Sequence, residues 1–215
     1  MKKDRVAIID YGLCNLFSVV HACEHIGLEA IVTDDIDEIL SADAAILPGV
    51  GAFGKAITEI RKKKLDFAID KFISSGKPFL GICLGLHLLF DSSEEFGYFE
   101  GLGIIPGKVR KIQSSHGKVP QIGWNTIEVS KENLGHPLVE SIREGEYMYF
   151  THSFFVEPLN IDNVLTYTNY GKLRYCSSVC RDNVVACQFH PEKSGVEGIR
   201  VYRNFKSMIK NKGKR

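Results

Sequence analysis

The chain has 215 residues, of which 44% are hydrophobic and 25% charged, and its formal net charge is +1. This length and composition predict one soluble domain, spanning residues 1–215, with a full hydrophobic core. A charge so close to zero argues against a nucleic-acid partner, and no apolar stretch predicts a secretion signal or a membrane span. We therefore expect a cytoplasmic protein.

The first half of the chain alternates short apolar strands with helical segments. Val6–Asp10 predicts the first strand, and Asn15 is expected to cap a helix that continues to Ile26. The same rhythm continues with strands at 30–33, 44–47 and 79–82, and helices at 36–40, from 54 to about 72, and from 84 to 90. Such a succession predicts an α/β fold, an open, mostly parallel, twisted sheet with helices on both faces.

The second half is richer in strand patterns. Strands are predicted at 108–112, 122–129, 147–150, 154–156, 164–168, 175–179 and 184–189, and a closing amphipathic helix at 198–209. We expect these strands to add antiparallel members to the sheet. No internal repeat or linker divides the chain.

Cys83 falls on the sharp turn between strand 79–82 and the helix that follows. Gly81 and Gly85 flank it and tolerate a tight backbone. A turn of this kind exposes a nucleophile at the start of a helix, where backbone N–H groups and the helix dipole favour the thiolate. The pattern indicates a catalytic cysteine, and a buried structural cysteine is the alternative.

A thiolate nucleophile needs a base, and His190 is the candidate. It follows the apolar strand at 184–189, and Pro191 is expected to hold the next residues extended. Positions i and i+2 of an extended chain point to the same side, so the Glu192 carboxylate can reach the imidazole N–H. Together with Cys83, these residues predict a Cys–His–Glu triad.

The loop Gly49-Val50-Gly51-Ala52-Phe53-Gly54 matches the dinucleotide-binding pattern G-x-G-x-x-G. Asp70 lies at the expected distance downstream, but it falls inside a helical pattern, and the loop follows the third strand rather than the first. A loop whose glycines let backbone amides approach a substrate, as an oxyanion hole requires, fits this position better.

Six cysteines in a chain without a recognisable signal peptide are expected to be reduced thiols. Two loose groups contain potential zinc ligands, but neither has the paired short spacings of a structural zinc site. These groups are His21, Cys23 and His25, and Cys176, Cys180 and Cys187. We expect no metal and no cofactor. The basic runs at 61–64 and 210–215 are expected to be solvated.

Short segments spread over nearly the whole chain carry a further signal. They are Asp10-Tyr11-Gly12, Asn15-Leu16, Pro48 to Phe53, Gly81 to Gly85, Gly123-Trp124-Asn125, Tyr149-Phe150, His152-Ser153 and Gln188 to Ser194. With these segments the chain resembles the class I (triad) glutamine amidotransferases, and more narrowly the glutaminase subunits of imidazole glycerol phosphate synthase. The resemblance implies hydrolysis of L-glutamine to L-glutamate and ammonia.

The resemblance also implies roles for residues around the triad. The backbone N–H groups of Leu84 and Val50 would donate to the oxyanion, that of Val50 after a peptide flip. The elbow geometry independently supports Leu84, because the residue after such a nucleophile points its N–H inward. The substrate contacts that the resemblance implies lie at Gly49, Gly51, His87, Glu95, Ser153 and Phe154.

A partner follows from the same resemblance. A separate (β/α)8 cyclase subunit would form a heterodimer with this chain and receive the ammonia through a closed route, because ammonia becomes protonated in neutral water. Glutaminase activity would be low until the partner binds its nucleotide ligand. The matching partner-facing positions are Asn15, Trp124, Tyr149 and Lys193. A core position for Trp124 and an ordinary surface charge at Lys193 are the alternatives.

Two positions depart from the family pattern. His87 stands where the family has glutamine four residues after the nucleophile, and Cys14 stands where it usually has glycine. Because His87 differs in shape and can ionise, other functions stay open. One is a paralogue that supplies ammonia for amidating a surface-polysaccharide sugar, and another is a catalytically weakened docking subunit. A cysteine peptidase or other α/β hydrolase also fits the triad chemistry alone.

Overall fold

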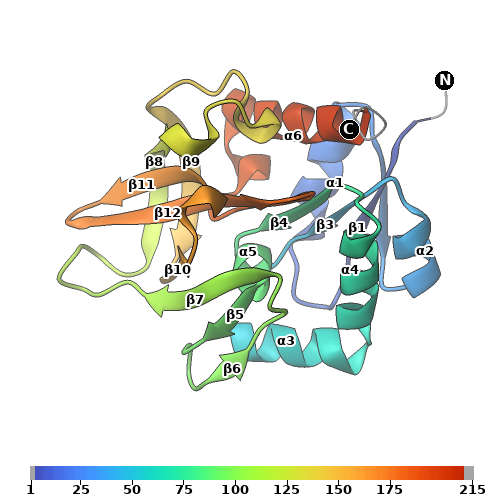
Figure 1. The fold of residues 1–215 in the computed structure, drawn as a ribbon, viewed down its shortest axis with the longest axis horizontal. Coiled ribbons are helices and arrows are strands. Elements are labelled where there is room, and N and C mark those ends of the chain that lie inside the picture. The colour runs from blue at the N-terminus through green and yellow to red at the C-terminus, as the bar shows by residue number, and fades with distance from the viewer. Residues whose placement is uncertain (1–2, 211–215) are drawn as a thin grey trace.

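The computed structural model describes residues 3–210 and contains a long twisted sheet (Figure 1). Its parallel part runs in the order β2–β1–β3–β4–β13, and every neighbouring pair in it is parallel. The strands are β1 (Arg5–Ile9), β2 (Glu29–Thr33), β3 (Ala44–Leu47), β4 (Phe79–Ile82) and β13 (Val184–Cys187). The carboxyl ends of β3, β4 and β13 therefore meet at one edge of the sheet, where ligands of such folds bind.

Helices cover both faces of this parallel part. On one face lie α1 (Leu16–His25) and α6 (Gly195–Lys210), whose buried side chains share a core. On the other face lie α2 (Ile36–Ser41), α3 (Phe53–Lys62), α4 (Leu65–Ser74) and α5 (Leu84–Leu88). This arrangement confirms the predicted α/β class.

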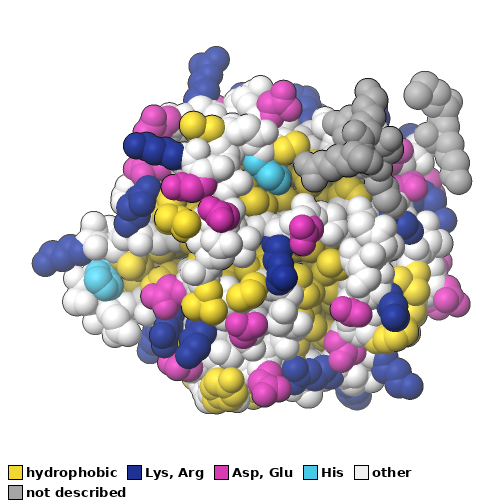
Figure 2. Space-filling model, viewed as in Figure 1, with side chains coloured by type: hydrophobic (Ala, Val, Ile, Leu, Met, Phe, Trp, Pro, Cys, Tyr) yellow, Lys and Arg dark blue, Asp and Glu magenta, His cyan; other side chains and the backbone are white. Residues whose placement is uncertain are grey.

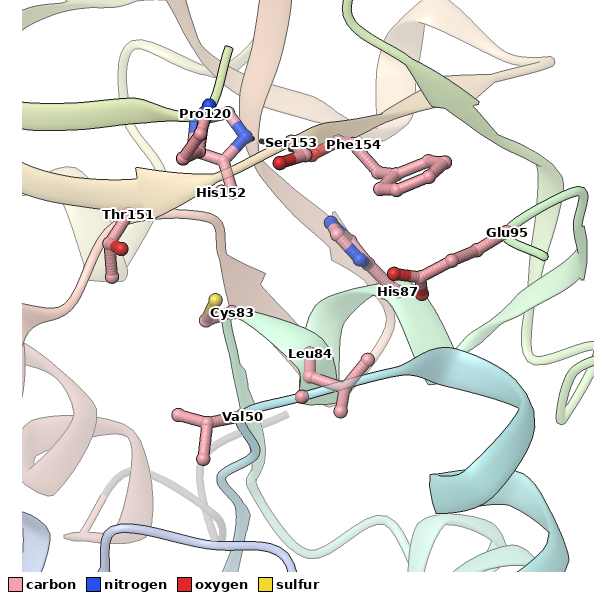
Figure 3. Close-up of a pocket in the computed structure, with 11 residues that line it drawn as sticks. Val50, Cys83, Leu84, His87, Glu95, Pro120, Thr151, His152, Ser153 and Phe154 are labelled. Carbon is pink, nitrogen blue, oxygen red and sulfur yellow. Dashed lines mark hydrogen bonds between the residues drawn. The ribbon is translucent and has the colours of Figure 1, made fainter.

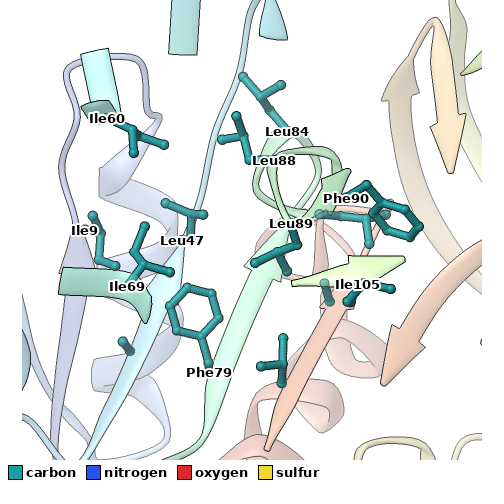
Figure 4. Packing of buried hydrophobic residues seen from close by; sticks show 14 of the residues in the cluster. Ile9, Leu47, Ile60, Ile69, Phe79, Leu84, Leu88, Leu89, Phe90 and Ile105 are labelled. Atoms are coloured by element: carbon teal, nitrogen blue, oxygen red, sulfur yellow. The ribbon is translucent and has the colours of Figure 1, made fainter. Parts of the chain in front are cut away.

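Each parallel strand supplies side chains to two cores because successive residues point to opposite faces. In β1, Ala7 and Ile9 enter the core beneath α2–α5, whereas Val6 and Ile8 enter the core beneath α1 and α6. Figure 4 shows the first core from close by. The side chains labelled there are Ile9, Leu47, Ile60, Ile69, Phe79, Leu84, Leu88, Leu89, Phe90 and Ile105.

Antiparallel strands extend the sheet beyond β13. The path continues through β12 (Leu173–Arg181), β10 (Phe154–Pro158), β7 (Ile105–Lys111), β5 (Phe90–Ser93) and β6 (Phe99–Glu100), with only β5 and β7 parallel in this part. A branch formed by β11 (Val164–Tyr170), β8 (Gln121–Val129) and β9 (Glu146–His152) leaves from β12. Short 3₁₀ helices are η1 (Lys131–Asn133), η2 (Pro137–Val139), η3 (Ile161–Asn163) and η4 (Pro191–Lys193).

Two predicted helices and one predicted helix cap differ from the structure. The helix expected from 54 to 72 is divided into α3 and α4, because Lys64 adopts the left-handed conformation with φ of 59°. The helix expected to reach residue 90 ends at Leu88, and Phe90 begins β5, which pairs with the distant β7. Asn15 occupies the N-cap position of α1, but its side chain makes no capping hydrogen bond.

The surface of the described residues agrees with the near-zero net charge. On the face shown in Figure 2, Lys and Arg side chains are interspersed with Asp and Glu. None of the helices in residues 3–210 is long and apolar enough to cross a membrane. Most of the basic run at 210–215 lies outside the described residues.

Candidate active site

Cys83 lies on a strained turn where β4 meets α5. Its φ of 54° and ψ of −106° are unusual for a residue with a side chain, and its backbone N–H donates to Cys187 O at 2.8 Å. Gly85 brings α5 against β3, because a Cβ atom there would overlap the carbonyl oxygen of Leu47. The predicted elbow is present, although α5 is only five residues long.

Cys83 opens onto a pocket of about 340 Å³ (Figure 3). The sequence-predicted residues that line it are Val50, Gly51, Cys83, Leu84, His87, Glu95, Ser153 and Phe154, and the lining is completed by Pro120, Thr151 and His152. In Figure 3, Cys83, His87 and Glu95 direct their side chains toward the same hollow. Gly49 and His190 are not among the lining residues.

His190 and Glu192 form a buried pair. Nδ1 of His190 lies 2.7 Å from Oε1 of Glu192, and each side chain is only 3% exposed. The expected extended backbone is wrong, because Pro191 begins the 3₁₀ helix η4 and the carboxylate reaches the ring around this turn. Burial alone would lower the pKa of His190, but hydrogen bonding and charge interactions with Cys83 and Glu192 raise it to about 10.

The backbone around His190 is tied to β9. The His190 N–H donates to Tyr149 O at 2.9 Å, and the Ser194 hydroxyl donates to His190 O at 2.7 Å. Ser194 Oγ in turn accepts from the Tyr149 N–H at 3.0 Å. These bonds hold the imidazole at the carboxyl end of β13, beside the end of β4 that carries Cys83.

Both expected oxyanion donors are engaged with backbone carbonyls. The Leu84 N–H donates to Gly49 O at 3.4 Å, and the Val50 N–H donates to Leu13 O at 3.0 Å. Neither N–H group is available to an oxyanion at Cys83 while these two bonds are present.

Glu95 and His87 occupy the far side of the pocket from Val50 (Figure 3). The Phe53 N–H at the start of α3 donates to Glu95 Oε2 at 2.7 Å, and burial raises the pKa of this carboxyl group, while the Phe53 bond opposes the rise. Burial lowers the pKa of His87 to about 4, so its ring is neutral at pH 7.

Ser153 and Phe154 line the pocket and are held through their backbone carbonyl groups. Ser153 O accepts from the Ile112 N–H at 2.9 Å, and Phe154 O lies 2.8 Å from His152 Nδ1. These two consecutive residues are thus held by Ile112, which directly follows β7, and by the pocket-lining imidazole of His152.

Gln188 and His152 are functional candidates that the sequence analysis did not select. Gln188 is fully buried, and its amide Nε2 donates to Cys83 Sγ at 3.8 Å. His152 Nε2 lies 3.1 Å from the Tyr175 hydroxyl. The available signal for Gln188 was a polar residue at the end of an apolar strand, directly before Phe189 and His190.

Of the four residues expected to face a partner, Trp124 and Tyr149 lie on neighbouring strands, Asn15 precedes α1 and Lys193 lies in η4. Trp124 is 55% exposed and pairs with Tyr149 across β8 and β9, with ring centroids 6.0 Å apart. A core position for Trp124 is therefore wrong. Asn15 is exposed, and Lys193 is half-buried in η4, where its N–H donates to His190 O at 3.0 Å.

The glycine loop contributes to the pocket rather than to a nucleotide site. Val50 and Gly51 line the hollow with Cys83, whereas Asp70 is exposed on α4. All six cysteines are free thiols. Among residues 3–210, no three His, Cys, Asp or Glu side chains gather as a metal site would require.

The doubly wound sheet, the elbow cysteine and the buried His–Glu pair define an α/β domain of the triad-hydrolase type. Residues 7–208 match the family model described as glutamine amidotransferase class-I, and the chain belongs to this family.

Curated relatives extend over nearly the whole chain. A protein of Aquifex aeolicus named "Imidazole glycerol phosphate synthase subunit HisH" is 46% identical over 203 residues, which cover 94% of this chain and 96% of that protein. A protein of the same name from Rhodopirellula baltica is 46% identical, and the match covers 93% of this chain and 96% of that protein. Another from Syntrophotalea carbinolica is 44% identical, and the match covers 94% of this chain and 100% of that protein.

Solved structures share the fold at lower identity. The structure of PurLQS from Thermotoga maritima aligns with a TM-score of 0.75 at 23% identity and covers 96% of this chain and 99% of that chain. The glutaminase domain of Trypanosoma brucei CTPS with bound acivicin aligns with a TM-score of 0.70 at 17% identity. The alignment covers 96% of this chain and 94% of that chain.

Proposed function

We propose that this chain is a cytoplasmic glutaminase subunit that hydrolyses L-glutamine and delivers the ammonia to a cyclase-type (β/α)8 partner for imidazole glycerol phosphate synthesis in histidine biosynthesis. The observation that carries the hydrolysis is the strained Cys83 at the mouth of a pocket beside the buried His190–Glu192 pair. The acceptor is supported by the shared name of relatives that are 40% to 46% identical to this chain.

In this proposal the reaction proceeds through a thioester. The Cys83 sulfur attacks the side-chain carboxamide carbon, and the C–N bond breaks as His190 gives its Nε2 proton to the departing ammonia. Water then attacks the thioester carbon while His190 accepts a proton, and the C–S bond breaks to release L-glutamate. Glu192 holds the ring through Nδ1, which leaves Nε2 as the nitrogen that exchanges protons with the reacting groups.

Substrate recognition is assigned to the remaining walls of the pocket. The Glu95 carboxylate would bind the α-ammonium group of glutamine, with the backbone near Ser153 and Phe154 beside its α-groups. His87 would contact the substrate with a neutral ring. Leu84 and Val50 would supply the oxyanion N–H groups, while Gly49 and Gly51 allow their loop to rotate.

The engaged oxyanion donors give a reason for low activity in the isolated chain. Leu13, whose carbonyl holds the Val50 N–H, lies two residues before Asn15. Tyr149, whose carbonyl accepts the hydrogen bond from the His190 N–H, packs edge-to-face against the exposed Trp124. A partner bound over Asn15, Trp124, Tyr149 and Lys193 would thus press on the two segments that position the oxyanion loop and the base.

The other candidate functions have less support. His87 in place of the family glutamine is the one feature that favours an ammonia supplier for surface-polysaccharide amidation. A non-catalytic docking role conflicts with an intact Cys83, His190 and Glu192. Growth of a histidine auxotroph that lacks its own subunit, after supply of this gene with its cognate cyclase, distinguishes the histidine route from the polysaccharide route.

We expect glutamate release to be slow in the purified chain and to rise at least tenfold with a cyclase subunit from the same genome and that cyclase's nucleotide ligand. Cys83→Ala should abolish the stimulated activity, because no other group supplies the nucleophile. The readout is glutamate formed from glutamine. Equal rates for Cys83→Ala and the native chain in the liganded complex would contradict the proposal.

A further inference from the structure

Gln188 bridges the nucleophile and a second buried side chain of the pocket. Its amide Nε2 lies 3.8 Å from Cys83 Sγ, and its Oε1 lies 2.8 Å from His87 Nε2. Gln188 is 0% exposed and His87 is 5% exposed. The backbone of Gln188 is also held, because its N–H donates to Ser177 O at 2.8 Å. The carboxamide is therefore confined at both ends.

The chemistry of the three groups favours one orientation of this carboxamide. A thiolate can only accept hydrogen bonds, so it favours the amide NH₂ and opposes the carbonyl oxygen. With the NH₂ group toward Cys83, Oε1 faces His87 and needs a donor there, so Nε2 of the imidazole carries the proton. The reverse orientation would place Oε1 against the sulfur and repel its negative charge.

We propose that Gln188 is a positioning residue for the nucleophile: its amide N–H donates to the Cys83 thiolate, and the Nε2–H of His87 holds the amide in that orientation. The proposal rests on the proposed function only in taking Cys83 as the nucleophile. It also gives His87 a role at this position, since a glutamine side chain could supply an equivalent N–H donor to Gln188 Oε1.

The test measures the rate at which the Cys83 thiolate reacts with an alkylating reagent, and it needs neither glutamine nor a partner. Cys83 is alkylated with iodoacetamide at pH 7, and the modified Cys83 peptide is quantified by mass spectrometry over time. In Gln188→Met, which keeps the length of the side chain but cannot donate, we expect alkylation of Cys83 about three- to tenfold slower, because the loss of one typical protein hydrogen bond changes an equilibrium by a factor of this order.

Variants at His87 test the hydrogen bond between His87 and Gln188 without altering Gln188 itself. His87→Phe removes the Nε2–H donor and should slow alkylation, whereas His87→Gln retains an N–H donor and should react within twofold of the native chain. Gln121→Met is the matched control: Gln121 is also a buried glutamine, 3% exposed, but it bonds to the Tyr175 hydroxyl and not to Cys83.

Equal alkylation rates in Gln188→Met and Gln121→Met would overturn the proposal, as would equal rates in His87→Phe and His87→Gln. A second readout is the stimulated glutaminase of the full complex, where Gln188→Met should lower kcat with KM within about twofold. If the native complex releases no glutamate while the alkylation differences persist, the proposed function fails and the positioning role stands.

Discussion

Gly49 has no room for a side chain, because a Cβ atom there would overlap the Tyr11 hydroxyl and lie 3.0 Å from Leu84 Cβ. Tyr11 is 1% exposed and sits in the core beneath α2–α5, so it cannot move aside without cost. Gly49 O also accepts from the Leu84 N–H. Because Gly49 carries no side chain, the loop that contains Val50 can pack against the turn at Cys83 and Leu84.

Gly49→Ala should lower the partner-stimulated glutaminase at least tenfold, because the added methyl group displaces the 49–50 segment from Leu84. Combining it with Tyr11→Phe removes the overlapping oxygen, although the Tyr11 Cζ position is still 3.3 Å away. We therefore expect partial recovery in the double variant, measured as glutamate release, with Tyr11→Phe alone as the control. Full activity of Gly49→Ala would show that this contact is unimportant.

Among the elements, α6 packs directly against η4, the turn that follows the proposed base His190. Gly198 in its first turns approaches η4 so closely that a Cβ atom would overlap Pro191 O and lie 2.8 Å from Ser194 Cβ. The Gly198 N–H donates to Ser194 O at 3.2 Å. Farther along the helix, Arg200 forms an ion pair with Glu146 of β9 at 2.5 Å. The helix therefore fixes η4 and β9, the two segments around His190.

The substitution Gly198→Ala changes the free energy of unfolding in opposite directions depending on whether helix propensity or the packing against η4 dominates. Helix propensity alone predicts a gain in the free energy of unfolding of about 1 kcal/mol. The overlap with Pro191 O predicts instead a loss of about 1–3 kcal/mol and lower glutaminase activity, because the His190–Glu192 turn is displaced.

Urea unfolding and glutamate release of Gly198→Ala check both expectations. Gly135→Ala is the control, since a Cβ atom at Gly135 meets no atom within 4 Å. A stabilised and fully active Gly198→Ala variant would contradict the packing argument.

At the scale of the whole molecule, three buried histidines make stability depend on pH in opposite directions. Burial lowers the pKa of His87 to about 4 and that of His152 to about 3. In the unfolded chain these rings bind protons below pH ~6.5, so stability is lost as pH falls below that value. The pKa of His190 is raised to about 10, so the folded chain holds this proton more tightly than the unfolded chain does. The resulting stabilisation is complete below pH ~6.5 and is lost as the pH rises toward 10.

We expect the free energy of unfolding to be largest near pH 6.5–7 and to fall on both sides. His87 accounts for a loss on the order of 3 kcal/mol between pH 6.5 and pH 4. In His87→Gln, the free energy of unfolding should fall less steeply between pH ~6.5 and pH ~4, as measured by urea unfolding at several pH values. His25→Gln, which removes an exposed imidazole of α1, controls for the loss of a histidine. An unchanged acid slope in His87→Gln would refute the assignment.

Much of the fold follows from local patterns in the sequence. The apolar runs 44–47 and 79–82 coincide with β3 and β4, because each run is buried on both faces of a parallel strand. The elbow at Cys83 follows from a strand, a turn and a helix in immediate succession. By contrast, Phe90 continues an apolar pattern that is typical of a helix, and only its pairing with Ile105 makes it part of a strand.

The sequence by itself thus determined the α/β class and the elbow that carries Cys83, and it predicted Cys83 as nucleophile with the pair His190–Glu192, since short apolar periods and turn residues encode structure within a few neighbours. Only the tertiary structure decided that Glu192 reaches His190 around a 3₁₀ turn, that the carbonyl groups of Leu13 and Gly49 accept from the proposed oxyanion donors, and that Gln188 contacts both Cys83 and His87. The physical reason is separation along the chain: Gln188 lies 105 residues from Cys83, and the packing of β13 beside β4 brings their side chains together.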